Sequence, residues 1–238
     1  MKTAWCLQQV PFEGPGVFQA CLQRRGYSVH QTVVPTQGLP QGQIDVLLIM
    51  GGPMSVNDPD PWIAQELEFV RRAIAGGIPT LGVCFGSQLL ASALGGAVAP
   101  GPTFEIGMVP VTLTHAGKTD PIFRALPDTF PVFQWHGEGI KLGSKGVPLV
   151  TSSDFPVQAF RYEAHIYGLL FHPEIEQTSI SVMCQECPQD VFRGGTCAEV
   201  LAQKTAEHLP FLHELANRVI DHLTSLPSPR LPKASSRN

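Results

Sequence analysis

The segment Ile78-Pro-Thr-Leu-Gly-Val-Cys84-Phe-Gly-Ser-Gln-Leu-Leu90 decides the fold. Its first half is a short apolar run that predicts a buried strand, and its second half predicts a helix that Gly95-Gly96 end. Cys84 lies at the sharp turn between them, with Gly82 and Gly86 two residues away on either side. A strand that turns directly into a helix is a repeating unit of α/β sheets, so the segment indicates that fold class.

The preceding 77 residues repeat the same alternation of strand and helix. Gln43-Ile-Asp-Val-Leu-Leu-Ile-Met50 is almost continuously apolar, as in strands that are covered on both faces. Asp60-Pro61 is a typical helix start, and apolar residues follow it at helical spacing. The other predicted elements are a strand over Thr3–Val10, a helix over Glu13–Gly26 and a strand over Tyr27–Val34. The order predicts an open, mainly parallel twisted sheet with helices on both faces, a flavodoxin-like α/β fold.

The pattern changes after residue 100. Short strands with turns between them predict a small antiparallel section that returns to the main sheet; they are Met108–Thr114, Val132–Trp135, Leu149–Ser152, Gln158–Arg161 and Tyr167–His172. The stretch from Ala198 to Ser225 is helical with a break at Pro210. We expect one domain over 1–225 and a disordered Pro/Ser-rich tail over 226–238.

Composition excludes several classes of protein. A net charge of −4 gives no basic surplus for nucleic acid or an anionic membrane. No apolar run approaches the ~20 residues that span a bilayer, and the N-terminus lacks the apolar region of a secretory signal. The six cysteines are too scattered for a disulfide scaffold. We therefore expect a cytoplasmic protein with reduced thiols.

Cys84 is the first candidate for chemistry. Small residues on both sides permit the strained turn of a nucleophile elbow, which lifts a side chain clear of the sheet. The N-terminus of the following helix favours a thiolate and can bind an oxyanion. The local pattern alone is equally consistent with a buried core cysteine.

Two further motifs follow predicted strands. His172-Pro-Glu174 supplies a base and a carboxylate that would fix its tautomer, as a cysteine attacking an amide requires. Gly51-Gly52-Pro53 allows a backbone N–H group to approach a ligand closely. Taken singly, the first is usually a strand end and the second an ordinary turn. Together with Cys84 they lie at the carboxyl ends of strands, where open α/β sheets build their sites.

These three motifs, in this order, resemble the class I (triad) glutamine amidotransferases. Glu105-Ile-Gly107 and Gln134-Trp-His-Gly137 are similar to the glutaminase domain of GMP synthetase and its stand-alone relatives. The resemblance covers roughly residues 40 to 178.

The resemblance implies hydrolysis of the glutamine side-chain amide without a cofactor. Cys84 would be the nucleophile, His172 the base and then the acid, and Glu174 the residue that orients His172. Backbone N–H groups of Gly52 and Phe85 would hold the oxyanion. The substrate-binding residues would be Gln88, Trp135 and His136: Gln88 and the backbone near the other two would hold the α-amino and α-carboxylate ends of glutamine. Gln88 could equally be a polar cap and His136 a structural histidine.

The acceptor of the ammonia stays open, because no phosphate-binding loop of a synthetase is present. The ammonia could pass to a separate synthetase subunit or be released, or the substrate could be another γ-glutamyl compound, as for a γ-glutamyl peptidase. A non-catalytic regulatory binding protein ranks lower, because no residue of the triad is lost. Cys184, Cys187 and Cys197 fall short of a zinc-ligand pattern, so we expect no metal.

Overall fold

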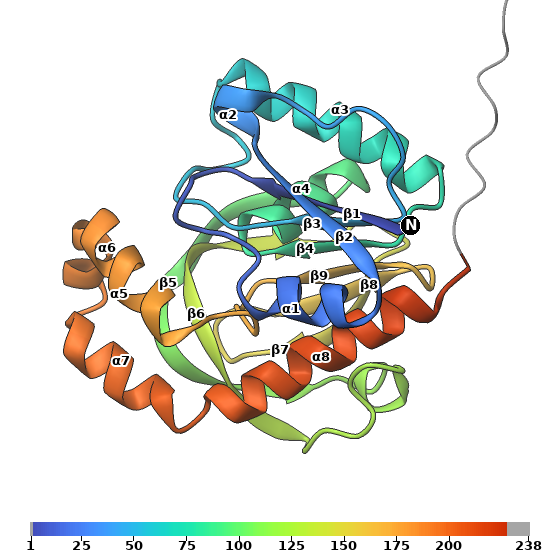
Figure 1. Ribbon diagram of the computed structural model, residues 1–238. Coiled ribbons are helices and arrows are strands. Elements are labelled where there is room, and N and C mark those ends of the chain that lie inside the picture. Colours follow the sequence, from blue (N-terminus) through green and yellow to red (C-terminus); the bar gives the residue numbers. More distant parts are fainter. Residues whose placement is uncertain (1, 228–238) are drawn as a thin grey trace, which may run out of the picture.

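The computed structural model describes residues 2–227, and in these residues nine strands form one sheet in the order β2-β1-β3-β4-β9-β8-β7-β5-β6 (Figure 1). The strands are β1 (Lys2–Gln8), β2 (Tyr27–Val33), β3 (Val46–Ile49), β4 (Thr80–Val83), β5 (Ala97–Leu113), β6 (Thr129–Lys141), β7 (Val147–Thr151), β8 (Ala159–Tyr162) and β9 (Ile166–Leu169). The α-helices are α1 (Val17–Arg24), α2 (Val34–Gln37), α3 (Pro61–Ala75), α4 (Phe85–Ala93), α5 (Gln177–Glu186), α6 (Pro188–Arg193), α7 (Ala198–Ala206) and α8 (Leu209–Ser225).

The sheet has a parallel half and an antiparallel half. Strands β2, β1, β3, β4 and β9 pair in parallel, which confirms the expected α/β architecture. Strands β8, β7, β5 and β6 continue the sheet with antiparallel pairs. This section is larger than the short strands predicted, because β5 begins at Ala97. Its first part contains two prolines and still pairs with β6 across an irregularity between Pro100 and Glu105.

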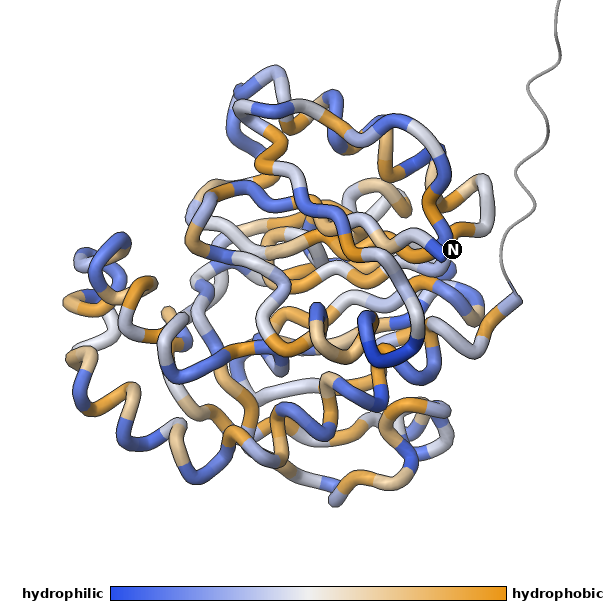
Figure 2. Tube along the Cα trace, in the orientation of Figure 1, coloured by the Kyte–Doolittle hydropathy of each residue, from blue (hydrophilic) through white to orange (hydrophobic). Residues whose placement is uncertain are grey.

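The alternation of side chains along the buried strands creates two apolar cores. In β3, Val46 and Leu48 join the core beneath α1 and α8, whereas Leu47 and Ile49 join the core beneath α3 and α4. The helices therefore cover both faces of the sheet, and Figure 2 shows apolar residues concentrated in its central strands. Burial of each such aliphatic side chain contributes roughly 1.5–3 kcal/mol.

Several predicted boundaries were wrong in ways that matter for the site. The first helix begins at Val17 rather than Glu13, since Gly14-Pro15-Gly16 cannot continue a helix, so Glu13 lies in the loop after β1. The last parallel strand ends at Leu169, so His172 lies beyond it. Helices α5 and α6 were not predicted. Pro210 lies in the first turn of α8, which begins at Leu209, and therefore does not break a helix there.

The predicted disordered tail lies almost entirely outside the described residues, which end at 227. Within residues 2–227, no helix has the length and apolar character to cross a membrane.

Candidate active site

Cys84 lies at the turn from β4 to α4 in a strained conformation. Its φ of 49° is in the left-handed region, which a residue with a Cβ seldom adopts. A Cβ on Gly82 would collide with the backbone of Gly86, and a Cβ on Gly86 would collide with that of Ile49. The amide of Gly86 donates to the carbonyl of Met50 at 3.1 Å, which ties the turn to the end of β3. The flanking glycines are therefore required by close packing.

His172 and Glu174 form a buried pair. His172 Nδ1 and Glu174 Oε1 are 2.8 Å apart, and both side chains are almost fully buried. The pairing does not come from strand periodicity, as the sequence suggested, because both residues lie in the turn after β9. The amide of His172 donates to the carbonyl of Phe133 at 2.9 Å, so β6 helps to hold the turn.

The surroundings of His172 favour its charged form. Burial alone would lower the pKa of the imidazole, but the charge of Glu174 and hydrogen bonding with Cys84 and Glu174 outweigh it. The pKa of His172 is therefore raised well above its usual value. Within residues 2–227, the buried Nε2 atom has no partner of regular hydrogen-bond geometry. The other ring nitrogen, Nδ1, is the one that pairs with Glu174.

The loop after β3 brings these groups together. A Cβ built on Gly51 would lie 3.2 Å from His172 Cε1 and 3.3 Å from Cys84 Cβ, so the imidazole and the cysteine meet at this glycine. In the described chain, the amide of neighbouring Gly52 donates no hydrogen bond. Phe85 is the first residue of α4, so its amide has no acceptor within the helix. Both predicted oxyanion donors thus border the Cys84 turn with free amides.

The three predicted substrate-binding residues line one pocket, but they differ in which of their groups make contacts and with what. Gln88 Nε2 donates to the carbonyl of Glu138 at 3.4 Å. The Trp135 carbonyl accepts from Cys84 Sγ at 3.6 Å. The His136 ring is buried with Nε2 3.1 Å from Glu105 Oε2, as a structural histidine would be. The substrate-binding role expected from sequence belongs to the backbone near Trp135 and His136, and it stays a prediction.

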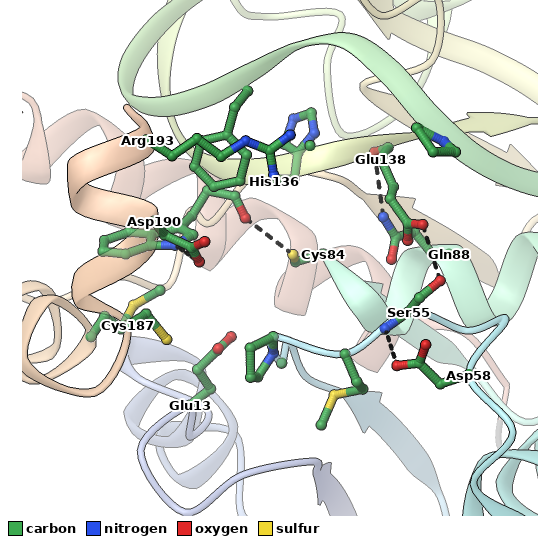
Figure 3. A pocket seen from close by; sticks show the side chains of 18 residues that line it. Glu13, Ser55, Asp58, Cys84, Gln88, His136, Glu138, Cys187, Asp190 and Arg193 are labelled. Atoms are coloured by element: carbon green, nitrogen blue, oxygen red, sulfur yellow. Dashed lines mark hydrogen bonds between the residues drawn. The ribbon is translucent and has the colours of Figure 1, made fainter. Parts of the chain in front are cut away.

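The pocket around Cys84 has a volume of about 420 Å³ (Figure 3). Sequence reasoning missed the four carboxyl groups that line it, those of Glu13, Asp58, Glu138 and Asp190. Asp190 Oδ2 accepts from Trp135 Nε1 at 3.0 Å. Burial raises the pKa of Glu13 to about 7, although the nearby His172 opposes the shift. The available signal for Glu13 was its place after β1, directly before glycine and proline.

The remaining thiols give no sign of a metal centre. Within residues 2–227, no group of three or more His, Cys, Asp or Glu side chains is arranged to hold a metal ion. Burial raises the pKa of Cys6 and Cys184, and it raises that of Cys187 to about 11. Burial therefore disfavours the thiolate form of these three cysteines.

A comparison with known protein families shows to which family this chain belongs. The profile described as glutamine amidotransferase class-I matches residues 18–184, more than half of the chain. The chain belongs to the class-I glutamine amidotransferase family. The chain contains the motifs on which the sequence resemblance was based. The profile match confirms the resemblance at the level of the family.

The relatives of this amidotransferase include stand-alone proteins and parts of larger enzymes. YfeJ of Salmonella typhimurium, described as glutamine amidotransferase-like, is 28% identical over 90% of this chain and 93% of its own length. GMP synthase [glutamine-hydrolyzing] of Thermomicrobium roseum is 37% identical over 56% of this chain, but the match covers only 24% of that enzyme. A γ-glutamyl-L-1-hydroxyisopropylamide hydrolase from a Pseudomonas species is 26% identical over 68% of this chain and 58% of its own.

A solved structure has the same architecture. The glutamine amidotransferase of Methylobacillus flagellatus aligns with a TM-score of 0.86 and 26% identity over 97% of both chains. The flavodoxin-like fold is therefore that of a known stand-alone amidotransferase.

Proposed function

We propose that this protein hydrolyses the side-chain amide of a γ-glutamyl compound, glutamine being the simplest, through a thioester on Cys84. The observation that carries the proposal is the meeting of the strained Cys84 turn with the buried His172–Glu174 pair at Gly51. A cysteine, an imidazole and a carboxylate in this order form an activated nucleophile.

The reaction would proceed in two halves. Proton transfer from Cys84 Sγ to His172 Nε2 gives a thiolate, which attacks the amide carbon, and the Gly52 and Phe85 amides hold the resulting oxyanion. The tetrahedral intermediate then expels the amine, which takes its proton from His172, and a glutamyl thioester remains. His172 next removes a proton from water, which attacks the thioester, and glutamate and the Cys84 thiol are released. Glu174 accepts the Nδ1–H hydrogen bond throughout and stabilises the imidazolium.

Glutamine hydrolysis is tested by measuring ammonia and glutamate from the purified protein. We expect Cys84→Ala to reduce both to the uncatalysed background. Cys197→Ala, which alters an exposed cysteine outside the pocket, is the matched control and should leave both rates unchanged. Equal turnover by the wild type and Cys84→Ala would refute the proposal.

Other γ-glutamyl amides are the second candidate, and two observations favour them. One relative is described as a γ-glutamyl-L-1-hydroxyisopropylamide hydrolase. The pocket of about 420 Å³ also extends on both sides of Cys84, whereas ammonia needs almost no room (Figure 3). A panel of γ-glutamyl amides assayed beside glutamine distinguishes the two, since a clear preference for free glutamine would exclude the second.

The likeness to GMP synthases suggests a third role, in which a separate synthetase subunit takes the ammonia. Glutaminase activity that rises severalfold on addition of a co-purifying ATP-dependent synthetase would support it. Full activity of the isolated chain with no such partner in a pull-down would count against it.

A further inference from the structure

The pocket has two halves, which lie on opposite sides of Cys84 in Figure 3. One half contains Gln88, the residue expected to hold the glutamyl end of the substrate, together with Ser55, Asp58 and Glu138. The other half is formed by the loop after β1 and by α5–α6, and its labelled residues are Glu13, Cys187, Asp190 and Arg193. A γ-glutamyl amide bound at Cys84 extends in both directions from the sulfur, so its amine portion would enter this second half.

The carboxyl groups of the two halves differ in their partners. In the first half, Ser55 Oγ donates to Glu138 at 3.0 Å and the Ser55 amide donates to Asp58 at 2.9 Å. In the second half, the Asp190 carboxylate accepts one hydrogen bond within residues 2–227, from Trp135. Among the described residues, Glu13 has neither a hydrogen bond nor an ion pair with a cation. Its carboxyl group faces the pocket with its hydrogen-bonding capacity unused.

The loop that carries Glu13 is fixed to the catalytic turn. The amide of Val17 donates to the carbonyl of Glu174 at 3.1 Å, and a Cβ on Gly16 would collide with that carbonyl. The Glu13 carboxyl also occupies the space into which a Gly51 side chain would project, beside His172 and Cys84. The position of Glu13 is therefore set by the same backbone that sets the His172–Glu174 pair.

A second polar atom without a regular hydrogen-bond partner belongs to His172, which lies beside Glu13. His172 Nε2 is buried without a regular partner, and His172 lines a small cavity together with Glu13. This is the nitrogen that would protonate the departing amine. The leaving group would therefore depart beside the Glu13 carboxyl, which lies near the charged His172 but forms no ion pair within residues 2–227.

We propose that the second half of the pocket, through Glu13 and with Asp190 beside it, selects γ-glutamyl amides whose amine portion carries a further protonated amino group. This inference rests on the proposed thioester reaction and specifies its substrate. The raised pKa of the half-buried Glu13 is consistent with it, because the surroundings disfavour the charged carboxylate despite the nearby His172, and a bound ammonium would favour it.

Arg193 is the cation that could oppose this selection. Its guanidinium lies over the Phe104 ring at 4.6 Å, and in the described chain it forms no ion pair. If Arg193 dominated the second half, an amine portion ending in a carboxylate would be preferred instead. The experiment must therefore compare substrates of all three charges.

The test uses three γ-glutamyl amides of equal chain length, made from 1,4-diaminobutane, pentylamine and 5-aminopentanoate. The far ends of their amine portions are an ammonium, a methyl group and a carboxylate. We expect kcat/KM of the wild type for the ammonium compound to exceed that for the methyl compound at least tenfold, and the carboxylate compound to be poorest. Glu13→Gln should reduce this preference at least tenfold. Glu68→Gln, on the exposed face of α3, is the matched control and should preserve it.

The possible outcomes separate this inference from the proposed function. Cys84-dependent hydrolysis of all three amides at similar rates, or best hydrolysis of the carboxylate compound, would overturn the inference and leave the thioester reaction intact. A Glu13→Gln variant that slows all three amides equally would also overturn it. If no amide, glutamine included, were hydrolysed in a Cys84-dependent way, the proposed function itself would fail.

Discussion

Replacing the buried Glu66 by glutamine should stabilise the protein, and increasingly so as the pH rises. Glu66 lies on α3 with no exposed surface, and its contact with a polar side chain is a hydrogen bond from Gln9 Nε2 at 3.3 Å. Burial raises the pKa of this carboxyl from 4.5 to about 8. The folded protein therefore holds a proton on Glu66 at neutral pH that the unfolded chain releases.

The sign of the effect follows from proton binding. Between the unfolded and folded pKa values the unfolded chain binds fewer protons, so the free energy of unfolding falls as the pH rises through this window. Each pH unit costs about 1.4 kcal/mol, and integration from pH 5 to pH 8 gives a loss on the order of 3 kcal/mol. In the Glu66→Gln variant, the amide side chain keeps the hydrogen bonding of the protonated carboxyl and does not titrate.

Urea denaturation of the wild type and Glu66→Gln at pH 5, 6, 7 and 8 measures this difference. The stability gained by the variant should grow by about 3 kcal/mol across the series. The control Glu68→Gln changes an exposed residue of the same helix and should follow the wild type at every pH. Curves for Glu66→Gln that run parallel to the wild type would show that Glu66 is not held protonated.

Three further outcomes are expected. A glutamine-analogue electrophile should modify Cys84 first, and early modification of Cys184 or Cys187 in peptide mass analysis, with activity intact, would contradict an activated Cys84. Gly52→Ala should lower kcat by about 10²–10³, because a Cβ there would lie 2.9 Å from Gln9 Cβ and displace an oxyanion donor; unchanged kcat would remove Gly52 from the mechanism. Leu215→Ala should lower the free energy of unfolding by about 2–5 kcal/mol, measured by urea denaturation, since α8 buries this side chain completely; a loss below about 1 kcal/mol would contradict its place in the core.

The parallel half of the sheet could be predicted because its determinants are local. The apolar run before Gly51 and the strand that turns at Cys84 each contain their own structural signal, and β3 and β4 lie within those segments. Parallel strands also bring their carboxyl ends to one edge, so the relative position of the motifs followed from the fold class.

Where the sequence misled, interactions between distant segments decide the structure. The first eight residues of β5 contain prolines that disfavour a strand, yet Ala97 to Pro100 pair with β6 and the pairing resumes at Glu105. The His172–Glu174 contact was expected from strand alternation, but a turn held by Phe133 produces it. Local propensity could not supply either result, since the partner strand lies elsewhere in the chain.

The site residues that could be predicted from the sequence and those that were missed lie on different kinds of elements. The proposed acyl-transfer residues lie in the short turns directly after β3, β4 and β9 and at the start of α4, so their spacing in the sequence is constrained. Glu13 and Asp190 come instead from a Gly-Pro loop and from α6, a six-residue helix, and they reach the pocket only because these elements pack beside Cys84. If the second half of the pocket sets substrate specificity, relatives can share the same reaction and differ in substrate by changes in these two segments alone.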